Sequence, residues 1–363
     1  MGLHPEIRAS LFIILRKQHM KLGIIGLPGS GKKTLFEAFT GIPVQVSQKQ
    51  DSLLGTVKVP DKRIDHLSNI YKPKKTIYAQ VEYNLPLVGL GHKDTQKSET
   101  LWANMRNCDA LIHVIRNFSV YGMDGPNPDQ DFGKMNDDMI LNDFMVVEKR
   151  IERMNKERGK KSASNLELDL LTQCLELLEK NQPIRLNSDL ANAPELRGYA
   201  FLTAKPILVL FNNEDENDSL PELSDMFQNE MVLPIRGKLE QELSQMNDDE
   251  ALEFLDEFNI SASAMSRIII ASYELMGLIS FFTVGEDEVR AWTIPENTPA
   301  DDAAGAIHTD FKKGFIRAEV LAYKDFIDAN NNYADARKNG TVRLEGKTYM
   351  VKDADIIHFR FNV

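Results

Sequence analysis

Cysteine is scarce in this chain of 363 residues, which excludes several classes of protein. The two cysteines, Cys108 and Cys174, lie far apart and at no spacing typical of metal ligands. A disulfide framework is therefore excluded, and a reducing compartment is indicated. The sequence predicts a cytoplasmic protein with no metal site built on cysteine.

Long apolar runs are also lacking. The longest near the start, Leu11–Leu15, is too short for a membrane span or a signal peptide and has no small-residue cleavage site. We therefore expect no membrane association. Met20 is the better opening because a strand pattern follows it at once, so residues 1–19 are expected to be an extension or a mis-assigned start.

The chain has no excess of positive charge. Its formal net charge is −11, with 42% hydrophobic and 27% charged residues, as in an ordinary globular protein. Such a charge opposes indiscriminate binding to polyanions, so any nucleic-acid contact must come from a local basic patch. The length favours two or three domains.

Strand and helix patterns alternate through much of the chain. Residues 21–25 read as a buried strand, and a helical spacing from Lys32 to Thr40 follows a glycine-rich segment. Residues 77–83 alternate between apolar and polar, which predicts a strand, and the apolar runs 110–115 and 207–211 suit central strands. Interleaved strands and helices predict an α/β domain with a parallel sheet.

The hydrophobic period becomes helical between residues 134 and 199. Apolar residues at 140–154 and again at 168–178 are spaced by three and four, with a polar break at 159–164. This pattern predicts an antiparallel helical hairpin inserted into the α/β domain. The tip carries a cluster of cations, which is typical of a solvated helix end and has RNA contact as the sharper alternative: Arg153, Lys156, Arg158, Lys160 and Lys161.

The last 85 or so residues read as a separate unit. Residues 281–284 and 289–294 are strand-like, a helix follows from Thr298-Pro299 to Lys313-Gly314, and further strands complete the segment. Two strands, a helix and then more strands predict a small β-grasp domain.

The glycine-rich loop Gly26–Lys32 has the pattern Gly-x4-Gly-Lys between a strand and a helix. In such a loop backbone N–H groups and the helix start face phosphate oxygens, and the lysine reaches the β- and γ-phosphates. The alternative is an ordinary glycine-rich turn between a strand and a helix. The motif predicts a nucleotide site in which these residues take part: Gly29, Ser30, Gly31, Lys32, Lys33 and Thr34.

The sequence lacks the residues that hold Mg²⁺ in a P-loop switch. The hydroxyl expected directly after Lys32 is replaced by Lys33, and Thr34 comes one position late. No aspartate follows the strand that ends near Tyr83, where a switch would hold the water on the metal. The sequence therefore predicts no metal ligands among these residues and leaves hydrolysis open.

A base-recognition motif is expected after the strand at 207–211. Asn212-Asn213-Glu214-Asp215 has the spacing Asn-x-x-Asp, in which Asn212 can brace the glycine-rich loop and Asp215 can accept from guanine N1 and N2. A solvated turn is the alternative. The predicted base-side residues are Asn212, Asn213 and Asp215.

Several longer strings resemble one family. Lys21–Pro28, Gly55–Arg63 and Phe201–Pro206 resemble segments of the YchF family of Obg-like P-loop NTPases. Closer matches occur at Val289–Thr293, Ile307–Val320 and Met350–Val363, and the resemblance extends over about residues 20–363 in one order.

This resemblance implies a P-loop nucleotide domain, a helical insertion and a C-terminal TGS domain, with ATP preferred over GTP and association with ribosomes. The metal-binding serine of the family falls on Lys33, its Asp-x-x-Gly aspartate falls near Leu85, and its Asn-x-x-Glu becomes Asn212-x-x-Asp215. The last change reopens the choice between ATP and GTP. The expected order is an extension (1–19), a P-loop domain (20–133 and 200–278), a helical hairpin (134–199) and a TGS domain (279–363).

Three functions are compatible with these residues. The first is a slow ATPase or GTPase switch acting on ribosomes or translation factors, and the second is a module that binds ATP or GTP without turning it over. The third, a P-loop kinase, is disfavoured because no acceptor site or lid arginines are recognisable. We favour nucleotide binding in a translation-linked role, with the hairpin and the TGS domain contacting the ribosome.

Overall fold

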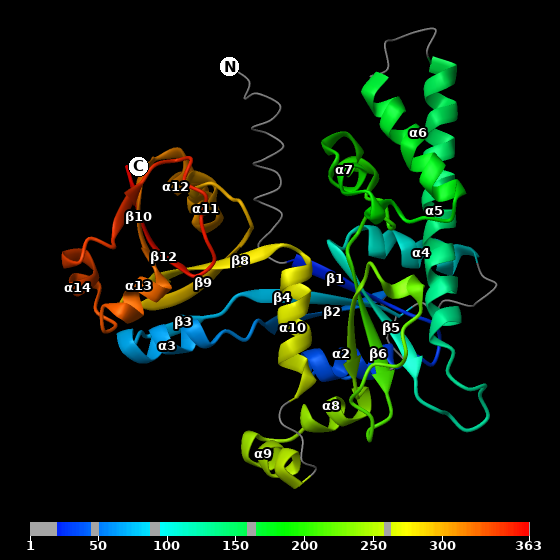
Figure 1. Cartoon of the computed structure of the whole chain (residues 1–363), viewed down its shortest axis with the longest axis horizontal. Coiled ribbons are helices and arrows are strands. Elements are labelled where there is room, and N and C mark those ends of the chain that lie inside the picture. The colour runs from blue at the N-terminus through cyan, green and yellow to red at the C-terminus, as the bar shows by residue number, and fades with distance from the viewer. Residues whose placement is uncertain (1–19, 45–50, 88–94, 158–164, 258–262, 363) are drawn as a thin grey trace. The chain divides into compact units, whose positions relative to one another are not determined.

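The structure is a computed structural model that describes residues 20–44, 51–87, 95–157, 165–257 and 263–362 (Figure 1). The chain forms two compact units, one of residues 21–55 and 82–268 and the other of residues 56–81 and those from 269 onward. Among the described helices, none is long and apolar enough to cross a membrane.

The first unit is built on a six-stranded sheet in the order β2-β4-β1-β5-β6-β7. Strands β1, β5, β6 and β7 pair in parallel. The strands are β1 (Met20–Ile25), β2 (Ser52–Lys58), β4 (Gln80–Pro86), β5 (Ala110–Asn117), β6 (Ile207–Asn213) and β7 (Met231–Ile235). Nearly every residue of β5 and β6 is buried, as expected for central parallel strands covered on both faces. The α/β sheet predicted from the sequence is confirmed.

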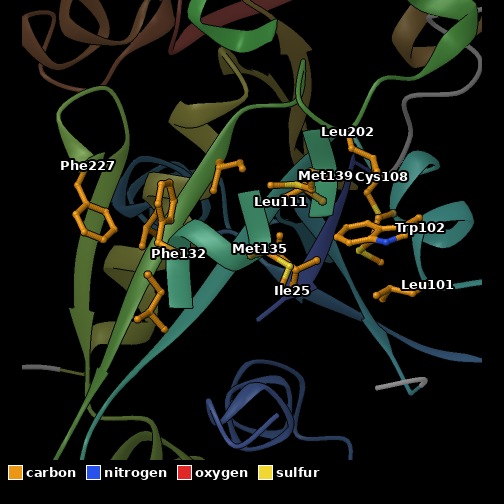
Figure 2. Packing of buried hydrophobic residues seen from close by; sticks show 14 of the residues in the cluster. Ile25, Leu101, Trp102, Cys108, Leu111, Phe132, Met135, Met139, Leu202 and Phe227 are labelled. Carbon is orange, nitrogen blue, oxygen red and sulfur yellow. The ribbon is translucent and has the colours of Figure 1, made fainter. Parts of the chain in front are cut away.

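Helices complete this unit. They are α2 (Lys32–Thr40), α4 (Thr95–Arg106), α5 (Pro128–Glu157), α6 (Asn165–Glu179), α7 (Ser188–Asn192), α8 (Gly237–Leu243) and α9 (Asp248–Glu257), with short 3₁₀ turns at Ile184–Leu186, Pro194–Tyr199 and Asp225–Phe227. Trp102 of α4 and Met135 of α5 pack with Leu111 of β5 in one apolar core (Figure 2). The start of α5 is thereby fixed on the sheet.

Helices α5 and α6 form the hairpin, with a core of their own. Val147, Met154 and Leu171 are buried between them, as the spacing of apolar residues predicts. The far end of the hairpin is incompletely described: Arg153 and Lys156 are exposed on α5, whereas Arg158, Lys160 and Lys161 lie outside the described residues.

A buried carboxylate on α5 joins the hairpin to the sheet. Asp143, fully buried, accepts from Arg106 Nη1 at 2.9 Å and from the backbone N–H groups of Leu202 and Thr203 at 3.1 and 2.7 Å. Thr203 Oγ1 donates a further bond at 2.8 Å. Burial raises the pKa of Asp143 above its usual range, and Arg106 and the hydrogen bonds oppose that rise. The segment that leads into β6 is therefore anchored to α5.

Replacing Asp143 tests this anchor. Asp143→Ala removes the only carboxylate that is recorded against Arg106 in the described residues and leaves two backbone donors without their acceptor, so we expect the free energy of unfolding to fall by about 3–5 kcal/mol. The control Glu152→Ala removes only an exposed pair with Lys156 and should cost less than about 1 kcal/mol. Urea unfolding followed by circular dichroism measures both, and equal midpoints for the two variants would contradict the assignment.

The second unit is built on another six-stranded sheet, in the order β11-β10-β12-β8-β9-β3. Its strands are β3 (Lys75–Ile77), β8 (Leu278–Val284), β9 (Glu288–Pro295), β10 (Phe315–Ala322), β11 (Arg343–Glu345) and β12 (Asp355–Phe361). Its helices are α3 (Lys62–Tyr71), α11 (Ala300–Ile307), α12 (Thr309–Lys313), α13 (Tyr323–Asp328) and α14 (Tyr333–Lys338), and α10 (Ala264–Leu275) enters it from the first unit. Alanines of α11 pack on the sheet around Phe281 and Phe359. The unit has the β-grasp arrangement.

Two details differ from the sequence-based expectation. The strand predicted over 77–83 is divided: β3 ends at Ile77 and pairs with β9, whereas β4 begins at Gln80 in the other sheet. Residues 56–81 thus pack with the C-terminal unit rather than with the P-loop domain. The helix expected from Thr298 to Lys313 is interrupted at His308, where the backbone is extended and the ring accepts a bond from Asp310 N.

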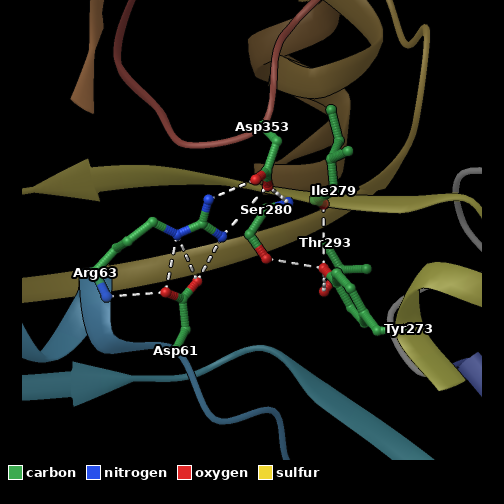
Figure 3. A network of polar contacts seen from close by, with 7 residues as sticks. All are labelled: Asp61, Arg63, Tyr273, Ile279, Ser280, Thr293 and Asp353. Carbon is green, nitrogen blue, oxygen red and sulfur yellow. Dashed lines mark hydrogen bonds and ion pairs between the residues drawn. The ribbon is translucent and has the colours of Figure 1, made fainter. Parts of the chain in front are cut away.

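An arginine fastens α3 within the second unit (Figure 3). Arg63 donates to Asp61 at 2.8–3.2 Å and to Asp353 at 2.5 Å, and Asp61 also caps α3. Asp353 in turn accepts from Ser280 N at 3.0 Å. Asp61 and Arg63, at the end of the string Gly55–Arg63, therefore hold the start of α3 in this unit.

Candidate functional site

The glycine-rich loop connects β1 to α2 and has a conformation that only glycine adopts without strain. Gly26, Gly29 and Gly31 have φ angles of 147°, 82° and 91°. A Cβ on Gly31 would lie 2.1 Å from Asn212 Nδ2, so a steric clash also excludes any side chain at this position. The loop therefore presents backbone and open space, as a phosphate cradle requires.

Lys32 lies inside this loop. Its Nζ donates to the carbonyl oxygens of Gly26 and Leu27, both at 2.7 Å. Burial, together with the neighbouring charge of Lys33, lowers the pKa of Lys32 to about 8. An ammonium held in so little water gains strongly from an anion placed beside it.

Asn212 joins the loop to two other segments. At the end of β6, its Nδ2 donates to Ser30 O at 3.0 Å, and its Oδ1 accepts from Gly237 N at 2.9 Å. Ser30 Oγ is buried and has no hydrogen-bond partner within the described part of the chain. Ser30, Gly31, Lys32 and Asn212 therefore form one connected group with a hydroxyl left over for a ligand.

A cavity of about 580 Å³ opens beside this group. It is lined by Gly31, Thr34, Phe118, Ser119, Asn212, Asn213, Glu214, Asp215, Glu216, Lys238 and Gln241. Its volume is within the range of small-molecule sites, and its wall combines an aromatic ring with several carboxylates. The residues predicted after β1 and after β6 thus meet at one cavity.

The two asparagines of the base motif have different roles in the structure. Asn213 Oδ1 accepts from Asn117 Nδ2 at 2.7 Å, and its Nδ2 donates to the carbonyls of Asn217 and Ser219 at 3.1 and 2.7 Å. Its amide therefore organises the loop after β6. At the cavity wall, Asp215 Oδ2 lies 3.7 Å from Lys238 Nζ, and the Asp215 side chain is 35% exposed, so its carboxylate is partly accessible.

The sequence did not predict three residues that line the cavity: Phe118, Ser119 and Gln241. Phe118 and Ser119 directly follow β5, and the carboxyl ends of neighbouring parallel strands meet at one edge. That rule could have identified them. Gln241 lies on the short helix α8, where its amide contacts Glu37 of α2, and nothing in its local pattern distinguishes it.

The positions that should handle a metal do not fit one. Lys33 is exposed at the start of α2, and Leu85 is buried within β4. Among the described residues no group of three or more His, Cys, Asp or Glu could hold an ion. Thr34, one position after Lys33, lines the cavity and carries a hydroxyl. A phosphate group fits the residues present, whereas a lysine and a leucine stand at the two positions that are expected to handle Mg²⁺.

Comparison with known proteins gives the family. A Pasteurella multocida protein named Ribosome-binding ATPase YchF is 38% identical over 94% of this chain and 99% of its own length, and the Bacillus subtilis protein of the same name is 37% identical with the same coverage. The chain belongs to the YchF family. The family model YchF-GTPase_C, described as a protein of unknown function (DUF933), matches residues 278–362 of this YchF chain.

Solved structures agree with this assignment. The Schizosaccharomyces pombe YchF GTPase has a TM-score of 0.80 and 28% identity over 94% of this YchF chain and 97% of its own. A Pyrococcus horikoshii OT3 GTP binding protein, at 16% identity, 94% and 100% coverage and a TM-score of 0.57, shows the fold alone. The YchF chain is a P-loop NTPase fold with a C-terminal β-grasp domain.

The lowered pKa of Lys32 predicts a pH dependence. Below about pH 8 the free protein has Lys32 charged and binds phosphate fully, and above it a proton must be taken up on binding. We expect nucleotide affinity to fall up to about tenfold per pH unit above pH 8. Fluorescence polarisation with a labelled nucleotide measures this, and Lys32→Arg, which stays charged, is the control. An equally steep decline in Lys32→Arg would contradict the assignment to Lys32.

Proposed function

We propose that this YchF chain binds a purine nucleotide, ATP or GTP, at the glycine-rich loop, in a cytoplasmic role linked to ribosomes. One observation supports it most: Lys32 lies within a loop that Asn212 braces, beside a cavity large enough for a nucleoside. Backbone N–H groups, Ser30 and Lys32 would hold the phosphates, and the wall that includes Phe118 and Asp215 would hold the base.

Binding in this proposal does not need Mg²⁺, and hydrolysis is very slow or absent. An ammonium at Lys33 beside a divalent ion is repelled by several kcal/mol at about 4 Å and a surface-like dielectric. The same charge placed against the β- or γ-phosphate supplies part of what the metal would supply. Leu85, where a switch places its aspartate, cannot hold a metal-bound water.

Removal of the metal tests this proposal. We expect EDTA to leave the affinity for ATP and GTP nearly unchanged, while Lys32→Ala weakens both by about 2–3 kcal/mol because a charge-assisted contact is lost. Lys33→Ser should restore coupling to Mg²⁺ with little turnover. Calorimetric titration and phosphate release measure these effects.

An active, slow ATPase or GTPase switch is the second candidate. The hydroxyl of Thr34 at the cavity favours it, because this group could serve Mg²⁺ in place of the missing one. Brisk Mg²⁺-dependent hydrolysis by the unmodified protein, abolished by Thr34→Val, would establish the switch and rule out metal-independent binding.

Ribosome association is proposed because the relatives are named for it and because the hairpin and the β-grasp unit offer surfaces for it. Arg153 and Lys156 are exposed on α5, and Lys156 is paired only with Glu152, at 3.7 Å. Arg150 differs, because it is engaged by Glu167 and by Tyr199 OH at 2.9 and 3.0 Å. Within the described part of the hairpin tip, Arg153 and Lys156 are therefore cations whose charge is not taken up by a buried contact.

Charge removal at the tip tests this surface. Neutralising the set Arg153, Lys156, Arg158, Lys160 and Lys161 should weaken cosedimentation with ribosomes and flatten its dependence on salt, since each lost phosphate contact lowers the salt slope. Arg153→Gln/Lys156→Gln can be compared with Lys134→Gln/Lys180→Gln, which removes two exposed cations from the opposite end of the hairpin. An equal loss of cosedimentation in both double variants would indicate that the cations at the tip belong to a solvated helix end and do not bind the ribosome.

A further inference from the structure

Two loops beside the nucleotide cavity expose large apolar side chains. Residues 118–127 connect β5 to α5, residues 214–230 connect β6 to β7, and both loops begin with residues that line the cavity. Single exposed apolar residues are normal on a protein surface, whereas several on adjoining loops mark a binding surface. We call the following exposed set the apolar rim: Val120, Tyr121, Met123, Leu220, Leu223 and Met226.

Hydrogen bonds hold the two loops of the apolar rim next to each other. Ser119 N, in the first loop, donates to Glu214 Oε1, in the second, at 3.0 Å. Ser224 Oγ, in the second loop, donates to Asp129 Oδ1 at 2.9 Å, and Asp129 belongs to the first turn of α5, directly after the first loop. The rim is therefore one surface formed by two segments that are distant in the sequence.

The first loop is also tied to the sheet and to the glycine-rich loop. Arg116, buried at the end of β5, donates from Nη2 to the carbonyl oxygens of Asp124 and Gly125 at 2.8 and 3.2 Å. Met123 lies against Gly29, since a Cβ placed on that glycine would be 3.3 Å from the Met123 methyl group. The backbone of this loop is thus held in place, while its apolar side chains remain exposed beside the glycine-rich loop.

Negative charge surrounds the apolar rim. Residues 206–235 contain no lysine, arginine or histidine. The second loop carries these carboxylates between residues 214 and 225: Glu214, Asp215, Glu216, Asp218, Glu222 and Asp225. Within the described part of the chain, only Asp215 among them is paired with a cation, Lys238 Nζ at 3.7 Å. The rim is therefore framed by negative charge that the described chain leaves largely unneutralised.

Charge and apolar surface together define the partner. RNA, an anionic membrane surface and a second copy of this chain, whose net charge is −11, would each be repelled by the carboxylates. A protein segment with lysines or arginines beside apolar residues, at the spacing of an amphipathic helix, matches both properties. Tyrosine and methionine, represented by Tyr121 and Met226, are also among the residue types enriched in protein interfaces.

We propose that the apolar rim binds a basic amphipathic segment of another protein. Tyr121, Leu223 and Met226 are the apolar contacts, and Glu222 and Asp225 pair with the cations of the segment. This surface is separate from the cations at the hairpin tip. The inference goes beyond the proposed function and depends neither on nucleotide binding nor on hydrolysis.

The test uses the full chain without nucleotide and a fluorescein-labelled peptide of about 18 residues, or five helical turns, with leucines on one face and lysines on the other. Binding is followed by fluorescence anisotropy. We expect Leu223→Ser/Met226→Ser to weaken binding by about tenfold, because two side chains lose their apolar contact with the peptide. Glu222→Gln/Asp225→Asn should weaken binding and also reduce its dependence on salt.

Matched controls lie elsewhere in the same unit. Leu141→Ser/Met145→Ser replaces the same residue types on α5, where they are 57% and 51% exposed, against 38% and 47% for the pair on the rim. Glu253→Gln/Asp256→Asn removes two exposed carboxylates of the same spacing from α9. Both controls should bind the peptide as the unmodified protein does. A peptide of the same composition in scrambled order should bind about tenfold more weakly, because it has no apolar face.

The outcomes separate the candidate occupants of the apolar rim. A loss of binding confined to the two rim variants supports the inference. Equal affinities of the rim variants and their controls, equal binding of the scrambled peptide, or no binding by the unmodified chain overturns it.

Two further measurements test occupants from this chain itself. Binding that occurs only after removal of residues 1–19 overturns the inference, because that segment, with its apolar run Leu11–Leu15 and the cations Arg16 and Lys17, would then occupy the rim. Sedimentation velocity measures self-association. A dimer that is lost in Leu223→Ser/Met226→Ser also overturns the inference, since it would assign the rim to a second copy of the chain.

Discussion

The hydrogen bonds of one buried side-chain amide hold the nucleotide edge of this protein together. Asn212 connects the carbonyl of Ser30 to the N–H of Gly237, so the loop after β1, the end of β6 and the start of α8 share a single side chain. Two glycines are required by the same contact, since a Cβ on Gly31 or Gly237 would lie 2.1 or 2.7 Å from the amide. Loss of this amide would release all three segments at once.

The contacts of this brace do not include the two positions where metal handling is expected, so the proposed nucleotide binding does not depend on them. The brace and Lys32 shape the phosphate cradle through backbone and buried contacts, which do not involve Lys33 or Leu85. Under the proposed function, the residues at the latter two positions affect metal handling while the cradle is retained. Preorganised backbone donors and one buried cation are sufficient for anion binding, whereas phosphoryl transfer also needs charge stabilisation placed for the transition state.

Much of this fold could be predicted because its signals are local. A strand, a glycine-rich loop and a helix follow one another within residues 20–40, and three- and four-residue spacing defines the hairpin helices. Other features depend on distant partners. Alternation at residues 77–83 is a correct signal for extended chain, but it does not specify which sheet each half joins. Similarly, the sequence groups Asn213 with the base-side residues and the structure has it lining the cavity, but the contacts of its amide with Asn117 and with its own loop are evident only in the folded chain.

The grouping of residues 56–81 with the C-terminal unit has a consequence for the order of synthesis. Strand β3, at residues 75–77, is an edge strand whose ladder partner is β9, at residues 288–290. Arg63 likewise depends on Asp353. At roughly 5–20 residues per second, a nascent chain adds the intervening stretch in about 10–40 seconds, so α3 and β3 leave the translating ribosome well before their partners exist. The β-grasp unit therefore cannot be completed during most of translation, and its final edge forms from a segment that was among the first to be made.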